Sequence, residues 1–188
     1  MIRSSKFICV LDTCVLHPLH VRDLLFWFAA HQLYKPKWSH HIFDEWRILL
    51  ERQGLSEDKR RKRISFAEKA FPDALVENYE AIIPTLSELP DEKDRHVVAA
   101  AIKTNANLIV TNNLKHFPND YLQQFGLYAK GADDFLADMI DLHPETAVSA
   151  FRDMVIGRKN PPIDIYEMLD ILRNNGLVQT ANYLHSQI

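Results

Sequence analysis

The stretch that decides the fold is KFICVLDTCVL, residues Lys6–Leu16. A continuous apolar run from Phe7 to Leu11 leads directly into Asp12. A short apolar run of this kind is typical of a strand that is buried on both faces of a parallel sheet. Open α/β sheets bind their ligands at the carboxyl ends of the strands, which is where Asp12 is expected. Asp12 is therefore either a carboxylate that binds a divalent cation or the N-cap of the next helix.

The composition is that of a globular protein with an uneven distribution of charge. The chain has 188 residues and a net charge of −3, and its length suits one hydrophobic core with a modest appendage. The first 63 residues carry a net charge of +5 and the remaining residues −8. A basic part beside an acidic part suits a nucleic-acid groove next to acidic metal ligands, although such an asymmetry also arises by chance.

The cysteine content and the apolar segments bear on the compartment. Cys9 and Cys14 are too few and too close together for a disulfide framework or a zinc site. The longest apolar window, Leu24–Ala30, is much shorter than a membrane span, and the amino terminus has no signal-peptide pattern. We therefore expect a cytoplasmic protein with reduced thiols and no membrane contact.

The common cofactor and hydrolase motifs are absent from the sequence. Neither G-x-G-x-x-G nor G-x-x-x-x-G-K-[ST] occurs, which excludes the usual dinucleotide and nucleoside triphosphate sites. Neither G-x-S-x-G nor H-E-x-x-H occurs. His40, His41 and His96 are tempting as catalytic bases, but we assign no role to them or to the other histidines.

The chain alternates between predicted strands and predicted helices. Residues 107–111 (NLIVT) repeat the pattern of the first strand, and a third short strand is predicted at 126–129. Tyr34–Trp38 is interrupted by Pro36, which favours an edge strand. Ser39 has the character of an N-cap. The helices are predicted over residues 21–33, 40–52, 91–104 and 132–140. Alternation of this kind predicts an α/β fold with a central parallel sheet.

The pattern changes beyond residue 143. Helices are predicted there over 145–156, 163–174 and 177–186, with no constellation of acids or nucleophiles. By contrast, three prolines within residues 72–90 indicate a looser segment with short helical pieces at best. We expect one domain over residues 1–143 and an all-helical C-terminal extension over residues 144–188.

Acidic and amide side chains are predicted at the carboxyl edge of the sheet. Glu45 lies beside the buried stripe of its helix, and Asp94 lies in the first turn of helix 91–104. A salt bridge and the helix dipole are the simpler explanations for these two carboxylates. Thr111 and Asn113 end the second strand and could orient water or a phosphate, or could only cap a loop. Carboxylates that converge on Asp12 would favour Mg²⁺ or Mn²⁺ and phosphodiester hydrolysis.

Five consecutive cationic residues, Lys59, Arg60, Arg61, Lys62 and Arg63, follow a predicted helix start at Ser56. Such a density of positive charge attracts a phosphodiester backbone. A solvated helix face and a docking surface for an acidic protein partner are the alternatives. The run is one candidate segment for binding a nucleic-acid backbone.

Taken in order, these motifs resemble the PIN domain over about residues 5–140. The resemblance rests on the strand that ends at Asp12-Thr13, on Glu45 in the second helix, on Asp94 before V-V-A-A-A, and on T-N-N after a strand. The segments D-R-H-V-V-A-A-A and N-L-K-H-F-P are similar to a bacterial subgroup related to VapC toxins. This resemblance implies a three-layer α/β/α domain and a metal-dependent endoribonuclease that acts on RNA. It also implies a cognate antitoxin protein as partner, and we keep a homodimer as a candidate assembly.

The resemblance assigns roles residue by residue. Asp12, Glu45 and Asp94 match the acidic metal ligands of the family, for Mg²⁺ or Mn²⁺, and Thr111 matches a hydroxyl beside the site. Asn113 stands where many PIN domains have a fourth Asp. An amide can hold a water molecule but adds no charge, which puts a second metal ion in doubt. The predicted catalytic set is Asp12, Glu45, Asp94, Thr111 and Asn113.

Two other functions compete with the nuclease hypothesis. The first is a PIN-like module, weakened by Asn113, that binds RNA or protein without turnover. The second is a metal-dependent phosphatase built around a strand-end Asp. The haloacid-type D-x-D pattern is missing at Asp12-Thr13-Cys14, which disfavours the phosphatase.

Overall fold

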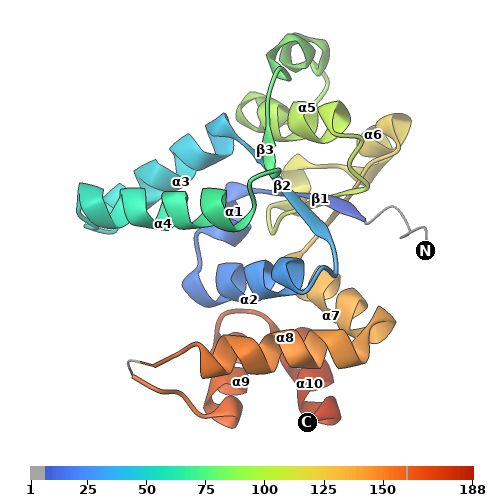
Figure 1. The fold of residues 1–188 in the computed structure, drawn as a ribbon. Coiled ribbons are helices and arrows are strands. Elements are labelled where there is room, and N and C mark those ends of the chain that lie inside the picture. The colour runs from blue at the N-terminus through green and yellow to red at the C-terminus, as the bar shows by residue number, and fades with distance from the viewer. Residues whose placement is uncertain (1–6, 160) are drawn as a thin grey trace. The chain divides into compact units, whose positions relative to one another are not determined.

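A computed structural model of the chain describes residues 7–159 and 161–188, so that Lys6 of the quoted stretch lies outside the described residues. It contains a sheet of five parallel strands in the order β3-β2-β1-β4-β5 (Figure 1). The strands are β1 (Ile8–Leu11), β2 (Lys35–Ser39), β3 (Leu75–Val76), β4 (Leu108–Val110) and β5 (Tyr128–Lys130). The predicted α/β fold with a central parallel sheet is confirmed.

The two strands with continuous apolar runs lie side by side in the middle of the sheet. Three of the four residues of β1 and all three of β4 are buried, as expected for strands that are covered on both faces. The register pairs Leu11 with Val110. Consequently, Asp12 and Thr111 leave the same edge of the sheet next to each other.

The prediction that Tyr34–Trp38 forms an edge strand is wrong. β2 lies between β1 and β3, and the short strand β3 comes from the segment 72–90 that was expected to be loose. The amide of Lys35 donates to the carbonyl of Phe7, just before β1, whereas the amide of Trp38 donates to the carbonyl of Ala74, just before β3 on the other side. The amides of consecutive residues in a strand point in alternate directions, so an amide hydrogen at position 36 would point towards β3. Pro36 has no such hydrogen, and no ladder bond is lost because pairing with β3 begins only after this residue.

A side-chain cap marks the start of α3 (His40–Arg52). The hydroxyl of Ser39 accepts a hydrogen bond from the amide of Ile42, and the helix that follows has the predicted bounds 40–52. α5 packs against β1, β2 and β4. The α-helices that belong to the same part of the chain as the sheet are α1 (Thr13–Leu16), α3 (His40–Arg52), α4 (Glu57–Ala70), α5 (Arg95–Lys103) and α6 (Asn119–Leu122). Its 3₁₀ turns are η1 (Glu80–Thr85), η2 (Glu92–Asp94), η3 (Leu114–His116) and η4 (Gln123–Phe125).

The described residues divide into two compact units. Phe7–His17 and Lys35–Lys130 form the unit that contains the sheet, and Pro18–Tyr34 with the residues from Gly131 onward form a helical unit. The helical unit consists of α2 (Leu19–Ala30), α7 (Ala132–Leu142), α8 (Pro144–Ile156), α9 (Ile165–Asn174) and α10 (Val178–Gln187). Thus the expectation of an all-helical C-terminal part is confirmed, whereas the boundary after residue 143 stays a prediction.

The helical unit has polar contacts of its own. The carboxylate of Asp133 in α7 accepts hydrogen bonds from the amides of Gln179 and Thr180, at 2.9 and 2.8 Å. It therefore satisfies amides at the start of α10 that have no partner within the helix. α2 packs against α8, and α10 packs against α7 and α9. Among the described residues, no helix is both long enough and apolar enough to cross a membrane.

Candidate active site

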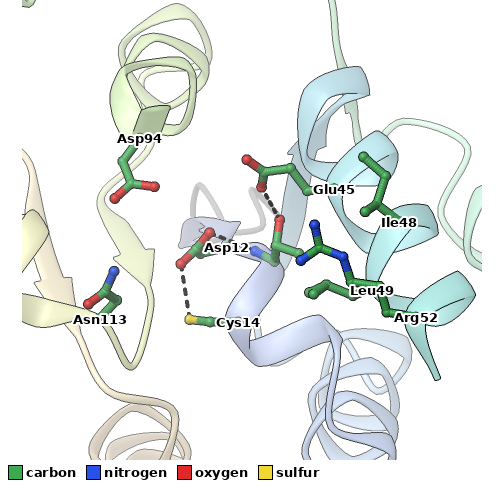
Figure 2. Close-up of a pocket in the computed structure, with 9 residues that line it drawn as sticks. Asp12, Cys14, Glu45, Ile48, Leu49, Arg52, Asp94 and Asn113 are labelled. Carbon is green, nitrogen blue, oxygen red and sulfur yellow. Dashed lines mark hydrogen bonds between the residues drawn. The ribbon is translucent and has the colours of Figure 1, made fainter. Parts of the chain in front are cut away.

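A pocket of about 360 Å³ opens where β1 and β4 end, within the unit that contains the sheet (Figure 2). α1 and α3 form one wall of the pocket, and the segments around η2 and after β4 supply the opposite wall. The residues that line it are Asp12, Thr13, Cys14, Glu45, Ile48, Leu49, Arg52, Asp94 and Asn113. Four of the five predicted catalytic residues are therefore brought together at one pocket.

Asp12 is buried at the end of β1 and is held by three hydrogen bonds. Its Oδ1 atom accepts from the amide of Thr13 at 2.7 Å, and its Oδ2 atom accepts from the Cys14 thiol at 3.0 Å. The hydroxyl of Thr111 donates to the same Oδ2 atom at 2.7 Å. Asp12 is thus the N-cap of α1 and also lines the pocket, so the capping alternative is confirmed, whereas the binding of a divalent cation by Asp12 stays a prediction.

Thr111 lies behind Asp12 and does not line the pocket. Its side chain is fully buried, and its hydroxyl also accepts a hydrogen bond of 3.1 Å from the amide of Asn113. The residue therefore joins Asp12 to the loop that carries Asn113. A direct catalytic contact of Thr111 stays a prediction, whereas its hydrogen bonds give it a positioning role.

Glu45 projects into the pocket because its neighbours anchor α3. Phe43 stacks on Trp38 of β2 with 5.2 Å between ring centroids, and Trp46 is fully buried. The Oε2 atom of Glu45 accepts a hydrogen bond of 2.5 Å from the hydroxyl of Thr13, and its Oε1 atom lies 3.1 Å from Nε2 of His96. Two partners thus hold the two oxygens of this carboxylate.

The protonation of Glu45 follows from these contacts. Burial on its own raises the pKa of the carboxyl, but the hydrogen bonds from His96 and Thr13 favour the charged form and outweigh burial. The pKa of Glu45 is consequently below its ordinary value of 4.5. The residue is a carboxylate at neutral pH, which is the form that coordinates a cation.

Asp94 closes the pocket on the side opposite α3. Its Oδ2 atom lies 2.7 Å from Nδ1 of His116, and the amide nitrogen of the Asn113 side chain lies 2.6 Å from the same ring atom. Burial raises the pKa of Asp94 above its ordinary value, and the charges of Asp12 and Asp91 raise it further, although the hydrogen bond from His116 opposes them. The carboxylates of Asp12 and Asp94 are therefore close enough to repel each other.

The donor set of the pocket fits a hard divalent cation. Among the described residues, Asp12, Glu45 and Asp94 form no ion pair with a Lys or Arg side chain. Carboxylates without cationic partners repel one another, and oxygen ligands are what Mg²⁺ and Mn²⁺ bind. In the described part of the chain, the ligand atoms of Asp91, Asp94 and His116 lie within 4.8 Å of one another, whereas those of Asp12, Glu45 and Asp94 form no group that close. An acidic cluster that could bind a metal ion is thus present at the edge of the pocket.

Several residues of the site were not foreseen from the sequence. Cys14 and Arg52 line the pocket, and His96 and His116 hold carboxylates of the predicted set. A signal for His116 was available, because Asn113 and His116 are three residues apart across a short 3₁₀ turn, where side chains at this spacing eclipse. His96, in contrast, meets Glu45 only through tertiary packing.

The basic run of α4 does not line the pocket. The guanidinium of Arg60 lies 3.5 Å from Glu51 and donates to the carbonyl of Leu55 at 2.8 Å, while Arg61 lies 2.8 Å from Asp58. Two of the five cations therefore have intramolecular partners. A role of Lys59–Arg63 in RNA binding stays a prediction.

Comparisons with known proteins divide the chain in two. Residues 9–115 match a model of the PIN domain, and residues 132–186 match the VapC50 C-terminal domain. A Mycobacterium tuberculosis protein named "Putative ribonuclease VapC50" is 45% identical over 80 residues, which are 43% of this chain and 47% of that protein. The match thus spans about half the length of this curated relative. No solved structure matches the chain. Because the PIN-domain model covers more than half of the sequence and its span contains the pocket residues, this chain belongs to the PIN-domain family.

Proposed function

We propose that this protein is a metal-dependent endoribonuclease that hydrolyses phosphodiester bonds of single-stranded or structured RNA. The observation that carries the proposal is the convergence of Asp12, Glu45 and Asp94 on one pocket without Lys or Arg partners among the described residues. The likeness to a protein named as a ribonuclease supports it as well.

The residues of the pocket have distinct roles in this proposal. Asp12, Glu45 and Asp94 would hold Mg²⁺ or Mn²⁺, which when bound offsets charge on the scissile phosphate and lowers the pKa of a water molecule. The side-chain amide of Asn113 lies at the pocket wall and is suited to orient water or a phosphate oxygen. Thr111 keeps the carboxylate of Asp12 in one orientation through its hydrogen bond.

The decisive experiment replaces the carboxylate of Asp12 by an uncharged amide of the same size. Asp12→Asn should abolish RNA cleavage in MnCl₂ or MgCl₂ and should also abolish the rise in thermal unfolding temperature that Mn²⁺ gives the wild type. Asp44→Asn is the matched control, because Asp44 is an exposed acid of α3 that pairs with Arg47. Full cleavage by Asp12→Asn would refute the proposed site.

A second function has one observation in its favour. Asn113 lines the pocket at the position where many PIN domains carry an Asp. The site therefore has one negative charge fewer than a PIN domain with that Asp. The chain would then act as a PIN-like module that binds RNA or protein without turnover. Tight association with RNA and no cleavage in any divalent metal would favour this module over the enzyme.

The toxin assignment is a further part of the proposal. The matches to the VapC50 C-terminal domain and to its M. tuberculosis namesake support a cytoplasmic toxin that acts on cellular RNA and is inhibited by an antitoxin protein. Expression of this protein alone should arrest the growth of a bacterial host. Coexpression of the protein encoded by the adjacent reading frame should relieve the arrest. The mass of the purified protein in solution would decide between a monomer and a homodimer.

A further inference from the structure

We propose that Arg52, in the last turn of α3, binds a backbone phosphate of the RNA at the mouth of the pocket, an inference that rests on the proposed function. Arg52 lines the same pocket as Asp12 and Glu45. Figure 2 shows its side chain reaching from α3 toward the side of the pocket where Glu45 lies. The structure therefore places a cation beside the carboxylates that would hold the metal ion.

The charge of the pocket creates a need for such a residue. Three carboxylates and a phosphodiester repel one another, and a phosphate approaches more readily where a fixed cation offsets that repulsion. Among the described residues that line the pocket, Arg52 supplies the one Lys or Arg side chain. The basic run Lys59–Arg63 is not part of this lining and cannot take its place inside the pocket.

Arg52 is also available for a ligand. Within the part of the chain that the structure describes, no carboxylate lies within 4.0 Å of its guanidinium group, although other arginines nearby are paired. Arg47 of the same helix bonds to Asp44 at 2.5 Å. A planar guanidinium with free N–H groups binds phosphate oxygens in pairs, which a point charge cannot do.

The neighbours of Arg52 favour a nucleotide over a small anion. Ile48 and Leu49 line the same wall, and Ile48 precedes Arg52 by four residues, which places both side chains on one face of α3. Ile48 is 48% exposed although it is a large apolar residue. An apolar surface next to a cation suits a ligand that carries an apolar part beside its charged phosphate, as a nucleotide does.

A simpler role for Arg52 is to stabilise the helix itself. A cation in the last turn of an α-helix interacts favourably with the helix dipole, and Arg52 lies in that turn. Lysine would serve the dipole equally well, because only the charge matters there. The two roles therefore separate when Arg52→Lys is compared with Arg52→Ala.

The test measures RNA binding without cleavage. Fluorescence anisotropy of a labelled single-stranded RNA oligonucleotide is recorded in EDTA over a series of KCl concentrations, for the full chain and for Arg52→Ala, Arg52→Lys and Arg47→Ala. We expect Arg52→Ala to weaken binding roughly tenfold and to lower the slope of log affinity against log salt by about 0.7. Arg52→Lys should keep the slope but regain only part of the affinity, and Arg47→Ala should match the wild type.

The outcomes separate this inference from the proposed function. If the wild type binds and cleaves RNA but Arg52→Ala behaves as Arg47→Ala does, the inference is overturned and the nuclease proposal stands. If Arg52→Ala lowers thermal stability and binding together, and Arg52→Lys restores both in full, the dipole role is favoured and the inference is again overturned. A wild type that neither binds nor cleaves RNA overturns both.

Discussion

The hydroxyl of Thr111 donates a hydrogen bond of 2.7 Å to the Oδ2 atom of Asp12, a residue 99 positions earlier in the sequence. The amide of Asp12 in turn donates to the carbonyl of Val110 at 3.1 Å. These two contacts join the ends of β1 and β4, and both partners of the first are buried. As a result, the orientation of the central carboxylate depends on a strand from a distant part of the chain.

Removal of this hydroxyl should destabilise the fold. In Thr111→Val a buried oxygen of Asp12 loses a donor, which is expected to cost about 1–3 kcal/mol of unfolding free energy. Urea denaturation measures the difference. Thr111→Ser retains the hydroxyl and should lie closer to the wild type, whereas equal stability of Thr111→Val and the wild type would show that the bond contributes nothing.

The stability of an Asp94 variant should depend on pH. The pKa of Asp94 is raised above its ordinary value of 3.8, mainly by burial and then by the charges of Asp12 and Asp91. Ionised Asp94 therefore costs folding free energy at neutral pH, and this cost disappears as the pH falls below about 4, where folded and unfolded chains both hold the proton. Asp94→Asn should consequently be more stable than the wild type at neutral pH, and the advantage should shrink on acidification.

Thermal unfolding at a series of pH values measures this effect. Asp58→Asn is the control, because Asp58 is an exposed acid of α4 that pairs with Arg61. A constant difference between Asp94→Asn and the wild type at every pH would contradict the interpretation. The result matters for function, because a site that repels its own charges gains stability when a cation binds.

The thiol of Cys14 should react slowly although it lines the pocket. Burial first, and then the charge of Asp12 and the hydrogen bond to that carboxylate, together raise the pKa of Cys14 to about 12. The thiol therefore stays protonated at neutral pH, and the thiolate is the reactive form. Alkylation by iodoacetamide, followed by mass spectrometry, should be much slower in the folded chain than in urea.

Asp12→Asn should accelerate the alkylation of Cys14, because it removes the negative charge that opposes ionisation of the thiol. Cys14→Ser identifies the modified site, since Cys9 is the other cysteine of the sequence and is fully buried. Equal rates for the folded and the unfolded wild type would show that the thiol is not protected.

The two lysines of the basic run are the best positions at which to test its role in RNA binding. Arg60 and Arg61 have carboxylate partners, so their replacement would also alter the helix. Lys59 and Lys62 are both exposed and are better positions for a double alanine variant. We expect weaker RNA binding and a flatter salt dependence from this variant.

The matched control for the basic run is a double alanine variant at Lys69 and Lys103, two exposed lysines outside the run. Equal salt slopes for both variants and the wild type would assign the run to solvent or to an acidic protein partner.

Local signals in the sequence were enough to predict the main helices. α3 has the predicted bounds 40–52, because the cap at Ser39 and the apolar stripe after it lie within one short segment. β2 could not be placed in the same way. Its neighbour β3 has two residues, and the pairing of Trp38 with Leu75 joins segments that carry no shared local pattern. Strand order is a property of tertiary pairing, which a single sequence records only weakly.

The same distinction applies to the candidate site. Each carboxylate follows a recognisable strand or helix signal, so that Asp12, Glu45 and Asp94 were selected from the sequence. Their partners were missed, because contacts such as that of His96 with Glu45 join residues 51 positions apart. Asp94 itself lies in the 3₁₀ turn η2, one residue before the helix in which it was expected.

The pairing of β1 with β4 has a consequence during synthesis of the chain. Asp12 and Glu45 leave the ribosome early, whereas Thr111 and Asn113 follow only after β4 has been made. A nascent chain that ends before β4 thus lacks the strand that orients its central acid and the loop that completes one wall. Under the proposed nuclease function, RNA cleavage would therefore begin only after β4 and the loop that follows it have been translated.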